Sequence, residues 1–208
     1  MRAHFDLPQR IALFPLDGAV LMPRTRLPLH IFEPRYLQML EDTLKTDHRL
    51  IGIIQPEGEG LASVGTAGRV VAFSEGDDGR MMISLKAISR FRLLDTQEGF
   101  APYLHGEIDW SPFRRDLKGP ERDPDLDRDA LFDALRRYMD AHELSTDWDA
   151  AARAEEETLV NSLAMMLPFS TGDKQALLET PTLRDRRELL QGLVEFALRG
   201  GDDEDRLQ

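Results

Sequence analysis

The 208-residue sequence contains no cysteine, which excludes disulfides, thiolate metal sites and cysteine nucleophiles. It contains no Gly-Lys pair, so the glycine-rich loop that cradles nucleotide phosphates is absent as well. No apolar run reaches membrane-spanning length, and the opening MRAHFDLPQR carries charges and a proline where a signal peptide needs an unbroken apolar segment. We therefore expect a cytoplasmic protein that does not hydrolyse ATP and has no membrane partner.

Basic charge is scarce in the second half of the chain. Residues 101–208 hold 14 Lys and Arg against 25 Asp and Glu, whereas residues 1–100 hold 12 against 13, and the formal net charge is −12. Nucleic-acid binding depends mainly on neutralising phosphates. The short basic groups, Arg24 with Arg26 and Arg184 with Arg186 and Arg187, are too small for this, and the second group lies among acids. We expect no nucleic-acid partner.

The first half of the chain is typical of strands around one helix. Hydrophobic residues make up 41% of the sequence, and its length allows one large domain or two small ones. From Pro34 to about Thr46, leucines at three- and four-residue spacing predict a helix that begins at the proline. Short apolar runs bounded by proline or glycine predict strands at 11–14, 27–31, 50–55, 64–73 and 103–108.

The clearest pattern runs from Met81 to Leu93, where apolar residues occupy most odd positions and polar residues most even ones. Strict alternation predicts a strand with one buried face and one solvent-exposed face, here called the wet face, as in an antiparallel sheet or a barrel wall. Lys86, Arg90 and Arg92 fall on the wet face. The pattern therefore predicts that Leu85→Asp collapses the first domain and that Arg90→Asp is tolerated.

The second half is predicted to be helical. The charged, proline-bearing segment between Pro112 and Pro124 indicates a linker. Beyond it, helical periodicity predicts a four-helix bundle, in which Ser170 and Thr182 each precede an Asp by three residues and serve as N-caps. The predicted helices cover 126–142, 148–167, 172–179 and 183–198, and Gly200 with Gly201 ends the last one. We expect domains at 1–112 and 125–199, a linker at 113–124 and a disordered tail at 200–208.

The search for catalytic chemistry gives no site. Ser84 and Lys86 are two apart on one strand and share a face, so a Ser-Lys dyad is conceivable, but the alternation makes both simple exposed polar residues. Five single histidines lack the i, i+4 spacing of a helical zinc site, and His30 is interpreted as a strand residue. The acidic run from Asp123 to Asp129 lacks the glycine and glutamate of a calcium loop and is interpreted as a solvated linker. We assign no catalytic residue, no cofactor, no metal ligand and no enzyme activity.

The prolines and apolar runs of the first half carry a family resemblance. IALFPL, LPLHIFEPRY, LIGIIQ, VGTAGRVV and ISRFRLLD occur in order between Ile11 and Asp95 and resemble the N-terminal, substrate-binding domain of Lon proteases. LVNSLAMMLPFSTGDKQALLETPTLRDR, beginning at Leu159, looks like the continuation in stand-alone bacterial Lon-domain proteins. The resemblance implies an α+β fold: a small PUA-like antiparallel β-barrel with one flanking helix, followed by a C-terminal helical bundle. The ATPase and peptidase modules of full-length Lon are missing from the sequence.

By resemblance, the function is that of a non-catalytic protein- or peptide-binding module, an adaptor in protein quality control. Its partners would be unfolded or extended polypeptide segments or one partner protein. Two alternatives stay open: a minimal hydrolase or trans-acting protease component, and a PUA-like RNA binder. Arg35 and Tyr36 fit a helix start as well as a peptide contact, and Met82 is unusual on the wet face. The sequence therefore assigns no peptide-binding residue and leaves the oligomeric state undetermined.

Overall fold

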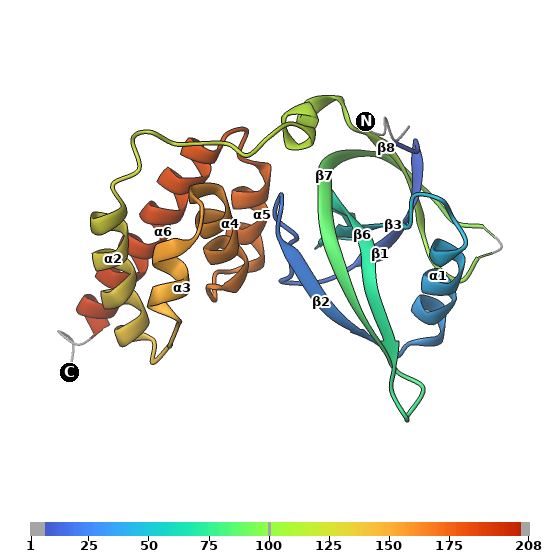
Figure 1. Ribbon diagram of the computed structural model, residues 1–208, viewed down its shortest axis with the longest axis horizontal. Helices are drawn as coiled ribbons and strands as arrows, with labels where there is room; N and C mark the ends of the chain where they lie inside the picture. The colour runs from blue at the N-terminus through green and yellow to red at the C-terminus, as the bar shows by residue number, and fades with distance from the viewer. Residues whose placement is uncertain (1–6, 100, 205–208) are drawn as a thin grey trace. The chain divides into compact units, whose positions relative to one another are not determined.

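The computed structural model describes residues 7–99 and 101–204 (Figure 1). The chain divides into two compact units, Met1–Gly119 and Pro120–Gln208. The first unit contains the strands and one α-helix, and the second contains only helices (Figure 1). The α+β class expected from the sequence is confirmed.

All of the predicted strands of the first unit are present. Helix α1 (Pro34–Leu44) begins at Pro34, as expected, and buries Tyr36, Met39, Leu40 and Thr43. The remaining elements are β1 (Arg10–Pro15), β2 (Arg26–Ile31), β3 (Leu50–Ile54), β4 (Pro56–Glu57), β5 (Gly60–Leu61), β6 (Val64–Glu75), β7 (Met81–Gln97), β8 (His105–Asp109) and the 3₁₀ helix η1 (Ser111–Leu117).

The main sheet has six strands in the order β2-β7-β6-β3-β1-β8. Strand β8 also pairs with β7, so β7, β6, β3, β1 and β8 close a ring, while β2 lies outside it and, among the described residues, pairs only with β7. The expected antiparallel barrel is wrong in detail, because β1 and β3 are parallel. The physical reason is the connection between them: β2 and α1 intervene, and such a crossover returns the chain in the same direction.

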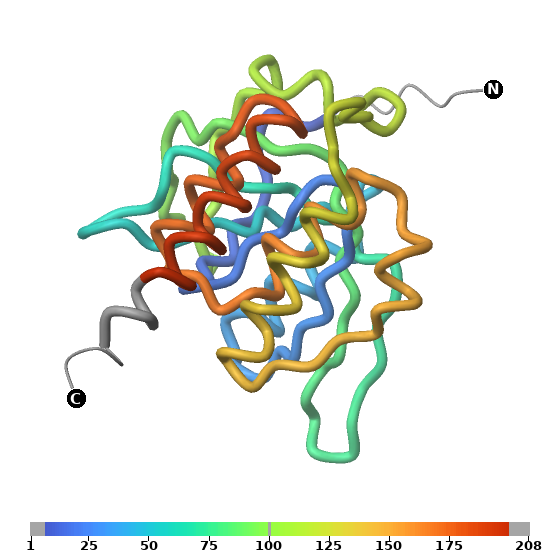
Figure 2. Tube along the Cα trace, turned by 90° about the vertical axis from the view of Figure 1, so that its left-hand side faces the viewer, coloured from blue at the N-terminus to red at the C-terminus, as the bar shows by residue number. Residues whose placement is uncertain are grey.

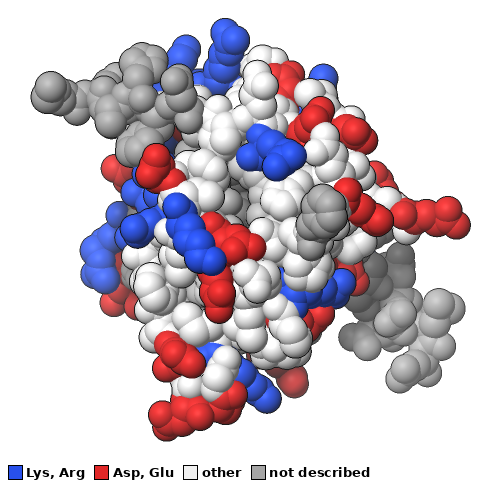
Figure 3. Space-filling model, turned by 90° about the vertical axis from the view of Figure 1, so that its right-hand side faces the viewer, with Lys and Arg blue, Asp and Glu red and all other residues white. Residues whose placement is uncertain are grey.

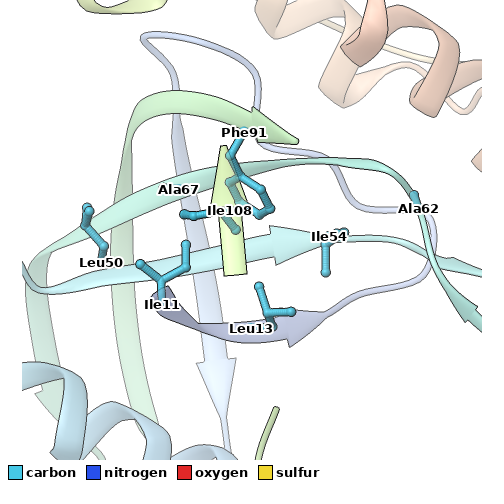
Figure 4. Close-up of a cluster of buried hydrophobic side chains, with 8 residues drawn as sticks. All are labelled: Ile11, Leu13, Leu50, Ile54, Ala62, Ala67, Phe91 and Ile108. Atoms are coloured by element: carbon cyan, nitrogen blue, oxygen red, sulfur yellow. The ribbon is translucent and has the colours of Figure 1, made fainter. Parts of the chain in front are cut away.

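The interior of the ring is filled by apolar side chains that point toward one another (Figure 4). They come from five strands and the segment after β5, and comprise Ile11, Leu13, Leu50, Ile54, Ala62, Ala67, Phe91 and Ile108. Gly65 lets β3 and β6 approach here, since a Cβ at this position would lie 2.7 Å from both the Ile53 carbonyl oxygen and Phe91 Cζ. The close packing of β3 against β6 thus requires a residue without a side chain at position 65.

The predicted alternation of β7 holds for its odd positions. Ile83, Leu85, Ala87, Ser89 and Phe91 are buried, whereas Lys86 and Arg92 are exposed. Arg90 is the exception, with only 1% of its surface exposed. The interpretation of Arg90 as a wet-face residue is therefore wrong.

Helix η1 is what buries Arg90. Asp116 Oδ2 accepts hydrogen bonds from Nε and from the backbone N of Arg90, both at 2.9 Å, and Oδ1 accepts one from Nη2 at 2.9 Å. The guanidinium also lies over the Phe113 ring, 4.6 Å from its centroid. Residues 113–117, expected in a linker, thus pack on the outer face of β7. Arg24 holds the end of this segment by donating to the carbonyl oxygens of Lys118 and Gly119.

The second unit has five helices in its described part: α2 (Arg128–Ala141), α3 (Trp148–Arg153), α4 (Glu156–Met166), α5 (Thr171–Glu179) and α6 (Leu183–Glu204). The single helix expected over 148–167 is two, because Ala154 and Glu155 are extended, with ψ of 145° and 151°. The Arg128 guanidinium donates to the carbonyl oxygens of Ala152 and Ala154 at this break. A long-range partner thus replaces helical hydrogen bonds that the local pattern favoured.

The predicted caps of the second unit are confirmed. Asp173 N donates to Ser170 Oγ and Asp185 N to Thr182 Oγ1, each at 3.1 Å. The predicted stop at Gly200 is wrong, since α6 runs to Glu204. Glycine costs a helix about 1 kcal/mol without forbidding it. Of the tail expected at 200–208, residues 205–208 lie outside the described residues.

Buried arginines hold the second unit together. Arg186 of α6 donates to Asn161 Oδ1 of α4 at 2.7 Å and to the Leu177 carbonyl oxygen of α5 at 3.0 Å. Arg187 Nε donates to Asp123 Oδ2 at 2.7 Å, and Asp123 is buried. The interpretation of Asp123 as a solvated linker residue is therefore wrong. Asp127, by contrast, caps α2 by accepting from Ala130 N at 3.0 Å.

Candidate functional site

The residues considered for catalysis lie on the outer face of the first sheet. Lys86 is exposed, as the alternation predicted, whereas Ser84, also expected to be exposed, is half-buried. Among the described residues, no hydrogen bond joins the two side chains. His30 is exposed on β2, and His4 lies outside the described residues. In residues 7–99 and 101–204, no group of three or more His, Asp or Glu side chains is placed to hold a metal ion.

An exposed apolar group marks the free end of the β6–β7 hairpin, which stands out from the rest of the first unit in Figures 1 and 2. Phe32, Phe73 and Met82 are 59%, 54% and 53% exposed, and we name them the hairpin cluster. Met82 lies opposite His30 and Ser74, on the outer face, and Phe73 lies opposite Ile83, on the other face. Phe32 follows β2, with the Arg80 guanidinium 5.7 Å from its ring centroid. Exposed apolar groups of this kind mark interaction sites.

Strand β2 presents an open edge beside this cluster. Ala87 N donates to the Thr25 carbonyl oxygen at 3.0 Å, and the register from Arg26 to Ile31 is unbroken. Hydrogen-bonded pairs alternate in an antiparallel ladder, so the backbone groups of Arg26, Pro28 and His30 point away from β7. Pro28 therefore sits where its missing N–H costs no bond in the sheet. The N–H groups of Arg26 and His30, which point away from β7, can therefore donate hydrogen bonds to an added strand.

Arg35 and Tyr36 lie at a pocket of about 410 Å³ between the start of α1 and residues 98–99 and 101–104. Tyr36 is buried and packs on Phe14, with ring centroids 4.2 Å apart. Arg35 is exposed, forms a 2.9 Å ion pair with Glu33 and lies over the Tyr36 ring. Tyr36 is thus part of the core, and the charged residues that line this pocket in the described part of the chain are Arg35 and Glu98.

A second, polar pocket of about 300 Å³ lies at the other end of α1 and is lined by Arg10, Asp42, His48, Tyr103 and His105, among others. Tyr103 donates to Asp42 Oδ2 at 3.1 Å. Burial, together with this carboxylate, raises the pKa of Tyr103 to about 12. Burial, and then the charge of Arg10, lowers the pKa of His105. Sequence analysis missed this group because its members are brought together only by the fold.

His48 is expected to make the stability of the first unit pH-dependent. Its Nδ1 accepts a hydrogen bond from Leu50 N at 3.0 Å, and burial, followed by the charge of Arg69, lowers its pKa. A lowered pKa means that the unfolded chain takes up the proton first, so stability falls as the pH drops below the unfolded value of about 6.5 and through the folded pKa. Urea unfolding at about pH 7.5 and about pH 5 measures this loss.

His48→Asn is the control for this prediction, since its Oδ1 can replace Nδ1 as acceptor without titrating. The difference between the two pH values should be smaller in the variant. His105 contributes in the same direction in both proteins and therefore cancels. An unchanged difference would contradict the assignment to His48.

No helix in the described part of the chain is both long and apolar enough to cross a membrane. On the face drawn in Figure 3, basic and acidic side chains intermingle without an extended area of one sign.

Comparison with known proteins identifies the kind of domain that this chain resembles. Residues 10–195 match the family described as the ATP-dependent protease La (LON) substrate-binding domain. Lon protease 1 of Bdellovibrio bacteriovorus is 28% identical over 201 residues, which cover 89% of this chain and 24% of that protein. Lon protease 1 of Bacillus subtilis is 24% identical, over 92% of this chain and 25% of that protein. The chain thus spans about a quarter of the length of these relatives.

Two solved structures share the fold. The Lon N-terminal domain protein from Xanthomonas campestris is 25% identical with a TM-score of 0.65, and the alignment covers 88% of this chain and 97% of that one. The N-terminal domain of the Lon protease from the Mycobacterium avium complex is 12% identical with a TM-score of 0.62, covering 89% and 98%. The second likeness concerns the fold alone.

Proposed function

Because this chain belongs to the family of ATP-dependent protease La (Lon) substrate-binding domains, we propose that it is a non-catalytic module that binds unfolded or extended polypeptide segments. The resemblance covers the substrate-binding domain and neither the ATPase nor the peptidase module. The role we propose is that of an adaptor in protein quality control, in the cytoplasm, without a nucleic-acid or membrane partner. We place the polypeptide-binding surface on the first unit and treat the second as a separately folding helical bundle.

One observation supports this function most directly: the hairpin cluster lies next to the open edge of β2. Unfolded chains expose apolar side chains and unpaired backbone groups at the same time. An open strand edge can pair with the backbone of such a segment, and exposed aromatic or methionine side chains can hold its apolar residues without demanding one sequence. Phe32 and Met82 lie at the end of the same strand pair that presents the edge.

Removing the apolar side chains of this surface is expected to abolish most of the binding. Phe32→Ser with Met82→Ser should weaken the affinity for a reduced, alkylated and therefore permanently unfolded protein by at least about tenfold, since two truncated anchor residues cost roughly 1–2 kcal/mol each. Fluorescence anisotropy of the labelled unfolded protein measures the affinity.

The second unit supplies a matched control. Phe196 and Met166 are 77% and 66% exposed, so Phe196→Ser with Met166→Ser removes the same two residue types from positions that are even more exposed than Phe32 and Met82. This control should bind as the unchanged protein does. Equal losses in the two double variants would assign the binding to general surface hydrophobicity and contradict the proposed site.

A further inference from the structure

Three basic side chains lie in a row across three strands of the first unit. Lys86 of β7 lies directly opposite Arg26 of β2 on one side and Arg69 of β6 on the other. Directly opposite residues share a face of the sheet, with Cβ atoms about 4.5–5.5 Å apart. We name Arg26, Lys86 and Arg69 the basic row.

This arrangement is unfavourable for folding by itself. Like charges directly opposite each other destabilise a sheet. Two buried arginines of the protein are paired closely with acids, Arg90 with Asp116 and Arg187 with Asp123. Within the described part of the chain, neither Arg26 nor Lys86 has an ion-pair partner. The chain has a net charge of −12 and is therefore rich in acidic residues, yet those among the described residues do not neutralise Arg26 and Lys86. An acidic group of a ligand would compensate the repulsion between the basic side chains.

The basic row lies on the same face as Met82 and at a fixed distance from it. Between them is one row of small or uncharged residues, Pro28, Ser84 and Ala72. Lys86 and Met82 are four residues apart on β7, which corresponds to about 13–14 Å along a strand. An extended peptide beside β2 repeats this spacing, so its side chains at positions i and i+4 reach the basic row and the Phe32–Met82 pair.

We propose that this face selects extended polypeptide segments in which a carboxylate side chain lies four residues from a large apolar one. The carboxylate lies at the basic row, the apolar side chain contacts Phe32 and Met82, and the segment pairs with the open edge of β2. Charge complementarity identifies the ligand as acidic, and the strand edge with its adjoining apolar side chains identifies it as a polypeptide. The inference rests on the proposed function, because it names the class of segment that the same surface binds.

Peptides that differ in one residue test the selection. The probe is a ten-residue peptide of alternating Ser and Thr that carries Glu and Leu four positions apart, with analogues in which Gln or Lys replaces Glu. The unchanged protein should bind the Glu peptide about fivefold more tightly than the Gln peptide at low salt, as a single exposed ion pair allows. High salt should remove the preference. Equal affinities for the Glu and Gln peptides would overturn the proposal.

Lys86→Glu distinguishes a binding role from a structural one. The variant should lose the preference for Glu, favour the Lys peptide and still bind the Gln peptide. Its Tm should be equal or higher, because Glu between Arg26 and Arg69 replaces like charges by opposite ones. Lys118→Glu, an equal charge change at an exposed site outside the row, should leave the Glu preference unchanged. A lower Tm of Lys86→Glu with an unchanged peptide preference would overturn the proposal.

Other outcomes separate this inference from the proposed function. Binding of unfolded protein without any Glu preference would refute the inference alone, whereas no binding of unfolded protein or of any peptide would refute both. Tighter binding of a single-stranded RNA than of the Glu peptide, lost in Lys86→Glu, would assign the row to phosphates and overturn it. A dimer in light scattering that Lys86→Glu dissociates would make a second copy the occupant and also overturn it.

Discussion

Arg90→Asp is expected to unfold the first unit. Arg90 and Asp116 are both buried and share hydrogen bonds at 2.9 Å. Removing one partner of a buried ion pair costs roughly 3–5 kcal/mol, and a second carboxylate beside Asp116 adds repulsion. This cost is comparable with the whole stability of a small domain, about 5–15 kcal/mol. The variant should therefore be largely unfolded in its first unit at room temperature.

Tryptophan fluorescence can follow each unit by itself. The chain has 2 tryptophans, of which Trp110 packs on Phe91 in the first unit and Trp148 on Phe132 in the second. In a Trp148→Phe background, urea unfolding of Arg90→Asp should show the first unit unfolded at low denaturant. A Trp110→Phe background should show the second unit still folding.

Three further variants control the interpretation. Arg90→Leu with Asp116→Leu should recover much of the stability lost in Arg90→Leu alone, since apolar residues can replace a buried pair. Recovery stays partial because the backbone N of Arg90 loses Asp116 Oδ2 as its acceptor. Arg92→Leu, two residues further along the same face but exposed, should cost less than about 1 kcal/mol. Equal effects at positions 90 and 92 would contradict the role assigned to η1.

Leu85→Asp is the second substitution expected to unfold the first unit. Leu85 is fully buried, opposite Leu27 and Val70, and its Cβ lies where a side chain at Gly68 would clash. A carboxylate there has no cation or donor of its own and costs several kcal/mol, in addition to the packing lost with leucine. The same tryptophan signal should report a loss of at least about 4 kcal/mol.

The pH dependence of this effect tests its cause. Burial without a partner raises the pKa of an aspartate above its unfolded value of about 3.9, so the penalty of Leu85→Asp grows as the pH rises above that value. Leu85→Asn, of similar shape and without charge, should lack this dependence. The two variants should then differ at neutral pH and converge in acid. A constant difference between them would mean that the carboxylate reaches solvent, and that the assigned face of β7 is wrong at this position.

The burial of Arg90 is a feature that the sequence pattern could not predict. Alternation along β7 predicted correctly that Leu85 is buried and Lys86 exposed. It could not predict that Arg90 is covered, because the covering residue is Asp116, 26 positions away, in a segment whose charge and prolines indicate a linker. Periodicity reports how a strand divides into two faces. It does not report what else packs on the polar one.

The candidate site also contains one feature that the sequence indicated and others that only the fold creates. Met82 was unusual on the solvent-exposed face in the sequence alone, and the structure leaves both Met82 and Phe32, which follows β2, exposed at the same end of the β2–β7 pair. The basic row had no signal in the sequence, since Arg26, Arg69 and Lys86 are far apart and only the strand register brings them together. The polar pocket of Asp42, Tyr103 and His105 has the same origin.

The sequence by itself determined the α+β class, the order of strands and helices, the caps at Ser170 and Thr182 and the family to which the chain belongs. These follow from short-range patterns: alternation, helical spacing, proline at a helix start and the order of local motifs. Tertiary structure decided the closure of the ring, the burial of Arg90 and Asp123, the break between α3 and α4, and the row of basic side chains. Each of these depends on contacts between residues distant in sequence, whose free energy outweighs the local preference.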